Sequence, residues 1–194
     1  MSYSNGFEIM LKLFKILTIV GLVMTMPTTE SEAGPDPENT LVMELEHGRV
    51  VIQMLPELAP NHVARIKELT RQGFYDGIVF HRVMDGFMAQ TGDPTGTGSG
   101  GSGQNIKAEF SSEPYLRGTV GMARSRSPDS ADSQFFITFA PARSLDNKYT
   151  VWGRVIEGME NVDQIKKAPP GRQSGQVDDP DKILRLRVLA DIEE

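Results

Sequence analysis

An arginine beside apolar and amide residues is the clearest candidate for chemistry in this chain. The segment from Phe80 to Asp93 reads FHRVMDGFMAQTGD, so Arg82 is followed by Phe87, Met88 and Gln90. A guanidinium stays charged at physiological pH and presents several N–H donors in a rigid fork. It can stabilise a carbonyl oxygen or a nitrogen lone pair without losing a proton. Apolar side chains beside it would bind a ring and exclude water, which strengthens the field of the charge.

Other patterns that suggest chemistry are better explained by structure. The chain has no cysteine, which excludes disulfides and thiol catalysis. Its three histidines are scattered and lack spaced carboxylates, so we predict no metal site and no cofactor. The loop 96–103 contains the spacing GxGxxG, but no helix follows it, and we interpret it as a flexible loop. Ser133, His81 and Asp93 are the residue types of a hydrolytic triad, but no nucleophile elbow surrounds Ser133, so we reject a triad.

The elements that would position these residues are mostly strands. Apolar patterns predict strands over 41–45, 49–55, 78–83, 86–91, 118–123, 134–139, 150–155 and 182–190, and helices from Pro60 to Gly73 and over 159–167. Many short strands joined by turns favour a closed barrel, because closure removes exposed strand edges. We therefore expect a mainly β fold: a closed eight-stranded antiparallel β-barrel capped by two α-helices.

Composition and charge limit the possible functions. The 194 residues are 39% hydrophobic and 24% charged, which suits one globular domain with a sizeable core. The formal net charge is −6, and no basic run is long enough to bind phosphates. We therefore expect no nucleic-acid partner, and a monomer is the simplest oligomeric state.

The first 33 residues read as a targeting segment. Lys12 and Lys15 precede the apolar run 16–26, and the polar stretch that follows ends at Ala33. This order is typical of a signal peptide with cleavage after Ala33, and the run is too short to cross a membrane comfortably. An uncleaved anchor is the alternative.

The rest of the chain then divides into a linker over 34–39 and a folded domain over 40–194. Either Met1 or Met10 is possible as the initiator, because the nine residues before Met10 add an acid and no apolar run. After cleavage we expect no stable association with a membrane.

Further motifs follow the segment around Arg82. FHR at 80–82, GFM at 86–88, Gln90 and GD at 92–93 are followed by GMA at 121–123 and SQFFI at 133–137. In this order and spacing, from 41 to 192, they resemble the cyclophilin-type peptidyl-prolyl cis-trans isomerases. The resemblance implies the same capped eight-stranded barrel, with a substrate groove on its outer face. It also implies an enzyme that rotates the peptide bond preceding proline.

The resemblance assigns a role to each candidate residue. Arg82 would be the catalytic arginine, and Gln90 the residue that holds it in place. Phe87, Met88, Phe136 and Leu145 would form the walls of the proline pocket, and Ala123, Arg124, Gln134 and Tyr149 its peptide-binding rim. Since neighbouring strand residues point to opposite faces, we expect Phe135 inside the barrel and Phe136 in the groove.

Two stretches depart from the family pattern. The family often carries WLDGKH where this chain has SLDNKY from Ser144 to Tyr149, and the missing indole predicts weak binding of cyclosporin. Arg124 and Asp132 stand where smaller or neutral residues are frequent. The preference for residues flanking proline should therefore differ from that of better-known members.

The expected partners are proline-containing polypeptides, in particular unfolded exported proteins, and the expected location is the periplasm. One alternative is a proline-peptide-binding chaperone module in which catalysis is secondary. A weaker alternative is a nucleotide-binding protein that uses the glycine loop.

Overall fold

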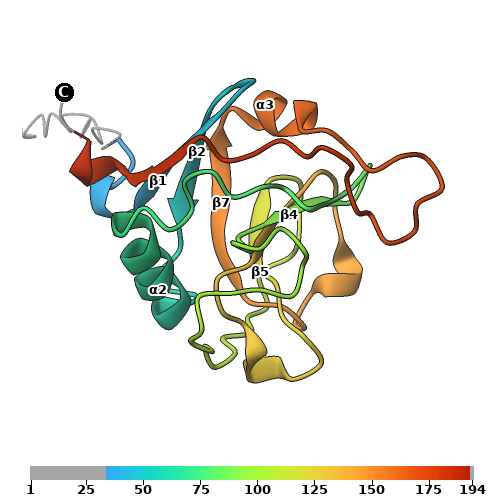
Figure 1. Ribbon diagram of the computed structural model, residues 1–194. Coiled ribbons are helices and arrows are strands. Elements are labelled where there is room, and N and C mark those ends of the chain that lie inside the picture. Colours follow the sequence, from blue (N-terminus) through green and yellow to red (C-terminus); the bar gives the residue numbers. More distant parts are fainter. Residues whose placement is uncertain (1–33, 193–194) are drawn as a thin grey trace, which may run out of the picture. The chain divides into compact units, whose positions relative to one another are not determined.

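The computed structural model describes residues 34–192 (Figure 1). The segment predicted as a signal peptide lies outside the described residues. Within the described part of the chain, no helix has both the length and the apolar character that crossing a membrane requires.

One antiparallel sheet of eight strands dominates the described region, as the sequence predicted. The strands are β1 (Thr40–Leu45), β2 (Gly48–Met54), β3 (Arg82–Met84), β4 (Met88–Thr91), β5 (Thr119–Met122), β6 (Phe135–Thr138), β7 (Val151–Glu157) and β8 (Arg185–Val188). Their order across the sheet is β3-β4-β6-β5-β7-β2-β1-β8. Two α-helices accompany them, α2 (Pro60–Arg71) and α3 (Met159–Gln164), with short 3-10 turns η1 (Pro37–Asn39), η2 (Pro128–Ser130), η3 (Arg143–Leu145) and η4 (Leu189–Asp191).

The prediction of a fully closed barrel is wrong. The edge strands β3 and β8 do not pair with each other, so the sheet is a half-barrel that stays open between them. Only the segments that precede these strands meet, through an isolated bridge between Val79 and Lys182 and a few backbone hydrogen bonds, among them one of 2.8 Å from the Phe80 amide to the Asp181 carbonyl. Asp179 has a left-handed φ of 51° and Pro180 has no N–H, so a regular ladder cannot continue here.

Side-chain alternation along β6 separates two apolar clusters. The Phe135 ring lies in the main core, with its centroid 5.5 Å from those of Tyr75 and Trp152. Phe136 points to the other face and joins a smaller cluster that includes Met88. The predicted division between these two phenylalanines is confirmed, and the smaller cluster forms the base of the pocket described below.

Helix α2 packs against the core through Val63, Ile66 and Leu69, which recur at helical spacing. Its N-cap residue, Ala59, supplies no side-chain cap. The carboxylate of Glu109 takes that role instead, accepting bonds from the amides at 61 and 62 at 3.1 and 3.0 Å.

Candidate active site

Arg82 is half-buried on β3, and three different elements hold its guanidinium. Its Nε donates to the Ser174 carbonyl at 3.0 Å, its Nη1 to Gln90 Oε1 at 3.2 Å, and its Nη2 approaches Met84 Sδ at 3.1 Å. The register of β3 and β4 places Arg82 directly opposite Gln90. The side chain is therefore fixed in direction, while one N–H on Nη2 has no partner among the described residues and is available to a ligand.

Gln90 is itself oriented by a second amide. Its Nε2 donates to Gln134 Oε1 at 2.8 Å, and Gln134 Nε2 donates to the Gly100 carbonyl at 2.8 Å. This chain of hydrogen bonds leaves the Gln90 oxygen facing Arg82. It connects the glycine loop to the guanidinium through two side chains.

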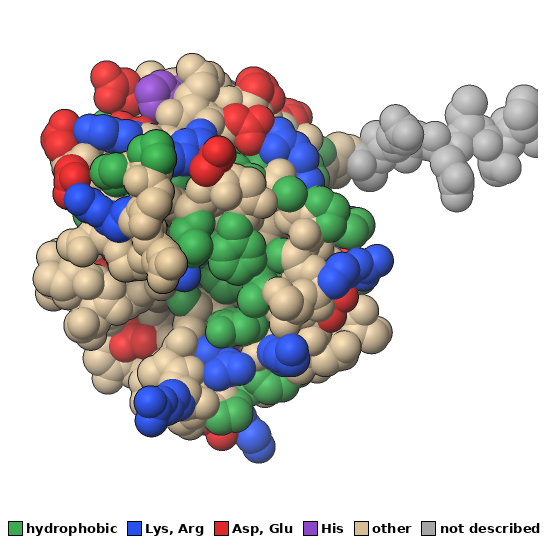
Figure 2. All heavy atoms as spheres, turned by 90° about the vertical axis from the view of Figure 1, so that its right-hand side faces the viewer, with side chains coloured by type: hydrophobic (Ala, Val, Ile, Leu, Met, Phe, Trp, Pro, Cys, Tyr) green, Lys and Arg blue, Asp and Glu red, His purple; other side chains and the backbone are tan. Residues whose placement is uncertain are grey.

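An apolar pocket of about 170 Å³ opens beside Arg82. Its lining residues are Arg82, Phe87, Met88, Gln90, Ala123, Arg124, Phe136, Leu145 and Tyr149. The ring of Phe136 lies between those of Tyr115 (stacked, 5.7 Å) and Tyr149 (edge-on, 5.9 Å). Hydrophobic side chains gather in the middle of the molecular face seen in Figure 2. A pocket of this size and lining suits one small apolar ring.

All ten residues singled out in the sequence come together here. Nine of them line the pocket, and the tenth, Gln134, lines a neighbouring cavity of about 430 Å³. That second cavity shares Gln90, Ala123 and Arg124 with the first. The two spaces are therefore continuous along one groove.

Burial shapes the charges near the pocket. Partial burial lowers the pKa of Arg82, but an arginine remains protonated at physiological pH after such a change. Burial likewise lowers the pKa of the neighbouring His81, against the attraction of Asp93. His81 is thus neutral near pH 7, and the positive charge beside the pocket on this hairpin belongs to Arg82.

The contact between Arg82 and the loop 172–177 was not predicted from the sequence. Ser174 contributes only its carbonyl, which any residue type has, so no side-chain signal marks it. Gly175 follows with φ 73°, and its carbonyl accepts from the Val83 amide at 2.8 Å. A Cβ on Gly175 would lie 2.5 Å from Met84 Cγ, so the close approach of this loop to β3 requires glycine.

The glycine loop is held by carboxylates of the protein itself. Asp93 accepts from the amides of Thr95 and Gly98 at 2.7 and 2.6 Å, and Asp132 accepts from the amide of Ser102 at 2.8 Å. Burial opposes ionisation of Asp93, but these hydrogen bonds outweigh it and lower its pKa to about 2. The amides that would bind a phosphate are already occupied, which argues against a nucleotide site.

The described residues do not form the triad rejected on sequence grounds, because the Ser133 hydroxyl donates to the Gly92 carbonyl at 2.7 Å rather than to a histidine. Nor do residues 34–192 contain a group of three histidine or acidic side chains placed to hold a metal ion.

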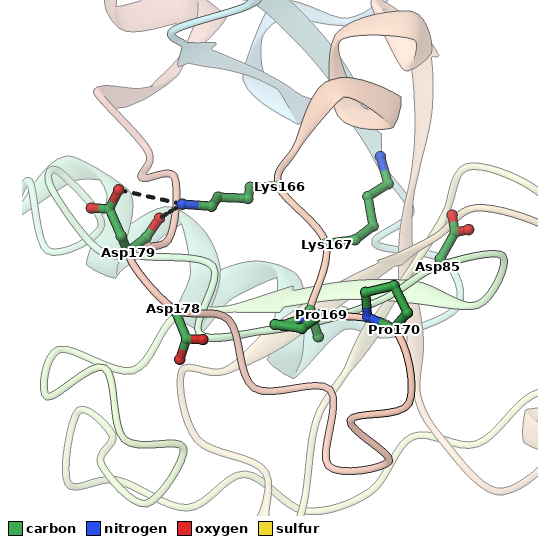
Figure 3. Close-up of a pocket in the computed structure, with 8 residues that line it drawn as sticks. Asp85, Lys166, Lys167, Pro169, Pro170, Asp178 and Asp179 are labelled. Carbon is green, nitrogen blue, oxygen red and sulfur yellow. Dashed lines mark hydrogen bonds and ion pairs between the residues drawn. The ribbon is translucent and has the colours of Figure 1, made fainter.

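A larger cavity of about 690 Å³ lies away from Arg82, between the β3–β4 turn and the segment after α3 (Figure 3). Its charged side chains largely neutralise one another: Lys166 Nζ lies 3.3 Å from the Asp179 carboxylate, and Asp178 accepts from Arg172 at 2.6 Å. It lacks the combination of apolar walls and a fixed free donor that the smaller pocket has.

A fixed guanidinium at the edge of an apolar pocket, in a groove on an antiparallel half-barrel, is suited to hold a small apolar ring and to polarise a carbonyl group or a nitrogen beside it. Comparison with known proteins identifies the family. A family model described as cyclophilin type peptidyl-prolyl cis-trans isomerase/CLD matches residues 40–188. The chain belongs to this family and is a cyclophilin-type peptidyl-prolyl cis-trans isomerase.

Individual relatives agree with that assignment. A probable peptidyl-prolyl cis-trans isomerase of Brucella suis is 46% identical over 182 residues, which cover 88% of this chain and 92% of the relative. A peptidyl-prolyl cis-trans isomerase of Synechococcus elongatus is 37% identical over 150 residues, which cover 77% of this chain and 96% of the relative.

Solved structures also resemble the fold. The crystal structure of a cyclophilin from Hirschia baltica superposes with a TM-score of 0.71 at 30% identity, covering 81% of this chain and 76% of that one. A cyclophilin-type isomerase of Cryptosporidium parvum, crystallised in the presence of the dipeptide Ala-Pro, gives a TM-score of 0.70 at 27% identity. The match covers 77% of this chain and 98% of that one.

Proposed function

We propose that this isomerase acts on exported, incompletely folded proteins and that Arg82 is its catalytic residue. The observation that carries the proposal is the fixed guanidinium of Arg82 at the edge of the apolar pocket. Proline-containing segments would bind along the groove, with the pyrrolidine ring in the pocket.

The chemistry requires no bond to break. Rotation about an amide C–N bond has a barrier of ~18–20 kcal/mol, because the nitrogen lone pair is delocalised into the carbonyl. In the twisted state the prolyl nitrogen becomes pyramidal and its lone pair can accept a hydrogen bond. The remaining N–H on Arg82 Nη2 would supply that bond and favour the twisted state over the planar one.

The expected contribution of Arg82 follows from the strength of such a bond. A charge-assisted hydrogen bond contributes ~1.5–3 kcal/mol, and each ~1.4 kcal/mol of preferential stabilisation is tenfold in rate. Arg82 therefore accounts for a rate enhancement of about 10- to 100-fold. Orientation of the ring by Phe87, Phe136 and Leu145, and exclusion of water, supply the remainder.

Gln90 acts as a positioning residue in this scheme. Its amide oxygen holds Arg82 Nη1, and Gln134 holds the Gln90 amide in turn. Neither amide needs to contact the twisted nitrogen to affect the rate.

The catalytic assignment is tested by measuring isomerisation of an Ala-Pro peptide by the wild type and by Arg82→Ala and Arg82→Lys. We expect kcat/KM to fall by about 10- to 100-fold in Arg82→Ala. Lysine should restore little, because a point charge cannot reproduce the fork that meets Ser174 and Gln90. Unchanged turnover in Arg82→Ala would refute the role.

The Arg82→Ala variant also distinguishes the isomerase function from the chaperone alternative. If the groove serves mainly to bind chains, Arg82→Ala should still suppress aggregation of an unfolded client as well as the wild type does. A parallel loss of both activities would tie protection to catalysis.

Export is a separate part of the proposal, supported by the order of basic, apolar and small residues in 1–33. N-terminal sequencing of the protein from the periplasmic fraction should begin at Gly34. An intact Met1 or Met10 would contradict cleavage after Ala33.

A further inference from the structure

Basic side chains flank the groove although the chain as a whole is acidic. Four of them, the basic rim, come from the loop after β5 and from the turn around η3: Arg124, Arg126, Arg143 and Lys148. The formal net charge of the chain is −6. On the face drawn in Figure 2, Lys and Arg side chains lie beside a hydrophobic centre, and most Asp and Glu side chains gather elsewhere.

Arg124 joins the two halves of the rim and lies on the groove itself. Its Nη2 donates to the Lys148 carbonyl at 2.8 Å and its Nη1 to the Ser125 carbonyl at 3.0 Å. Its guanidinium also lies 4.5 Å from the centre of the Tyr149 ring. These partners fix the position of Arg124 without neutralising it, because carbonyls and a ring carry no net charge.

The other members are also largely uncompensated. The Lys148 ammonium donates to the Ser144 carbonyl at 3.0 Å, and Arg126 is exposed. Among the described residues, Arg143 is the member of the rim that has a carboxylate within ion-pair distance, Asp146 at 3.2 Å. The rim thus keeps most of its positive charge at the surface.

The acidic residues nearest in sequence are engaged in structural bonds. Asp129 accepts from the Ala108 amide at 2.9 Å, Asp132 from the Ser102 amide at 2.8 Å, and Asp146 from the Tyr115 amide at 2.8 Å. Part of each carboxylate's charge is therefore satisfied by the backbone rather than by the rim.

We propose that the basic rim makes this enzyme favour proline segments that carry acidic residues close to the proline. The inference rests on the proposed binding of proline in the Arg82 pocket and adds the charge of the flanking residues. An extended peptide advances ~3.3 Å per residue, so side chains one to three residues from the ring come within reach of a rim that begins at the pocket wall. Attraction of this kind speeds association and weakens as salt is added.

The test compares peptides that share one Ala-Pro core and carry Ala, Glu or Lys at the flanking positions. At an ionic strength of ~0.01 M we expect kcat/KM for the Glu peptide to exceed that for the Lys peptide by about tenfold, and the ratio to approach one at ~0.5 M. Equal values for the Glu and Lys peptides at low salt would overturn the inference. Isomerisation of the Ala peptide reports on the proposed function separately, since this peptide carries no flanking charge for the rim to attract.

Matched charge reversals locate the effect. Arg126→Glu with Lys148→Glu changes two rim residues that do not line the pocket, and should abolish the Glu preference while leaving the Ala peptide unchanged. Arg49→Glu with Lys182→Glu changes the net charge equally, at exposed sites on β2 and before β8. If this control pair abolishes the preference to the same extent, overall charge is responsible and the rim is not.

Discussion

Replacing Gly175 with alanine tests how far the loop 172–177 determines the aim of Arg82. The backbone at Gly175 has φ 73°, and an added Cβ would lie 2.5 Å from Met84 Cγ and 3.2 Å from Arg82 Cγ. Either Met84 or the loop must move to relieve the contact. Both of them hold the guanidinium, Met84 through its sulfur and the loop through the Ser174 carbonyl.

The size of the effect has two parts. An alanine with left-handed backbone costs about 1–2 kcal/mol of stability. Loss of the bond from Arg82 Nε to Ser174 removes a charge-assisted hydrogen bond of ~1.5–3 kcal/mol, and if that bond aims the donor in the transition state the rate falls about 10- to 100-fold. Because the pocket walls are untouched, the loss should appear in kcat more than in KM.

The matched control is Gly171→Ala. Gly171 has φ 83°, and a Cβ there meets nothing within 4 Å. Gly171→Ala therefore has the same cost of a left-handed backbone but makes no contact with Met84 or Arg82. Its stability should fall by a similar amount, while its turnover stays at the wild-type level. Thermal unfolding and isomerisation of an Ala-Pro peptide measure the two quantities. If both variants turn over equally fast, the loop does not position Arg82.

Two further predictions concern the flanks of the site. Burial lowers the pKa of His62, although its 2.6 Å bond to Glu109 opposes this change. Burial would raise the pKa of Glu109, but its hydrogen bonds, with that to His62 the largest, lower it. Both shifts therefore reduce the stability of the fold as pH falls, beginning below ~6.5, where the histidine of the unfolded chain takes up a proton. Chemical denaturation from pH 7 to 5 should show a slope of up to ~1.4 kcal/mol per pH unit from this histidine, which His62→Gln should flatten; an unchanged slope would place its origin elsewhere. Ser144→Trp should tighten cyclosporin binding about tenfold by adding an N–H donor and apolar area, whereas Ser144→Phe should recover only part of this; equal calorimetric Kd values for both would exclude the donor.

The sequence predicted the parts of the fold that depend on local patterns. Alternation placed Phe135 in the core and Phe136 in the pocket cluster, and helical spacing from Pro60 predicted α2 closely. These features follow from period and turn chemistry, which neighbouring residues determine.

The features that were not predicted depend on contacts distant in sequence. The edge segments meet only at 77–80 and 181–183, and the pairing stops at Asp179 and Pro180, so the barrel does not close; no local pattern specifies that meeting. The role of Asp93 in holding the glycine loop was also not expected, because the loop's composition indicated only flexibility. The candidate site was recognisable because its side chains follow a family pattern, but the carbonyl of Ser174 has no such signature.

The bond between Arg82 and Ser174 links residues that are 92 positions apart. The pocket walls, from Phe87 to Tyr149, all precede Ser174 in the chain. During synthesis on the ribosome, the polypeptide would therefore contain the whole pocket wall before the segment that orients its arginine has been made. If the Ser174 carbonyl positions Arg82, as the Gly175→Ala variant tests, full turnover requires the C-terminal segment to have docked, and the enzyme gains its activity at the end of its own folding.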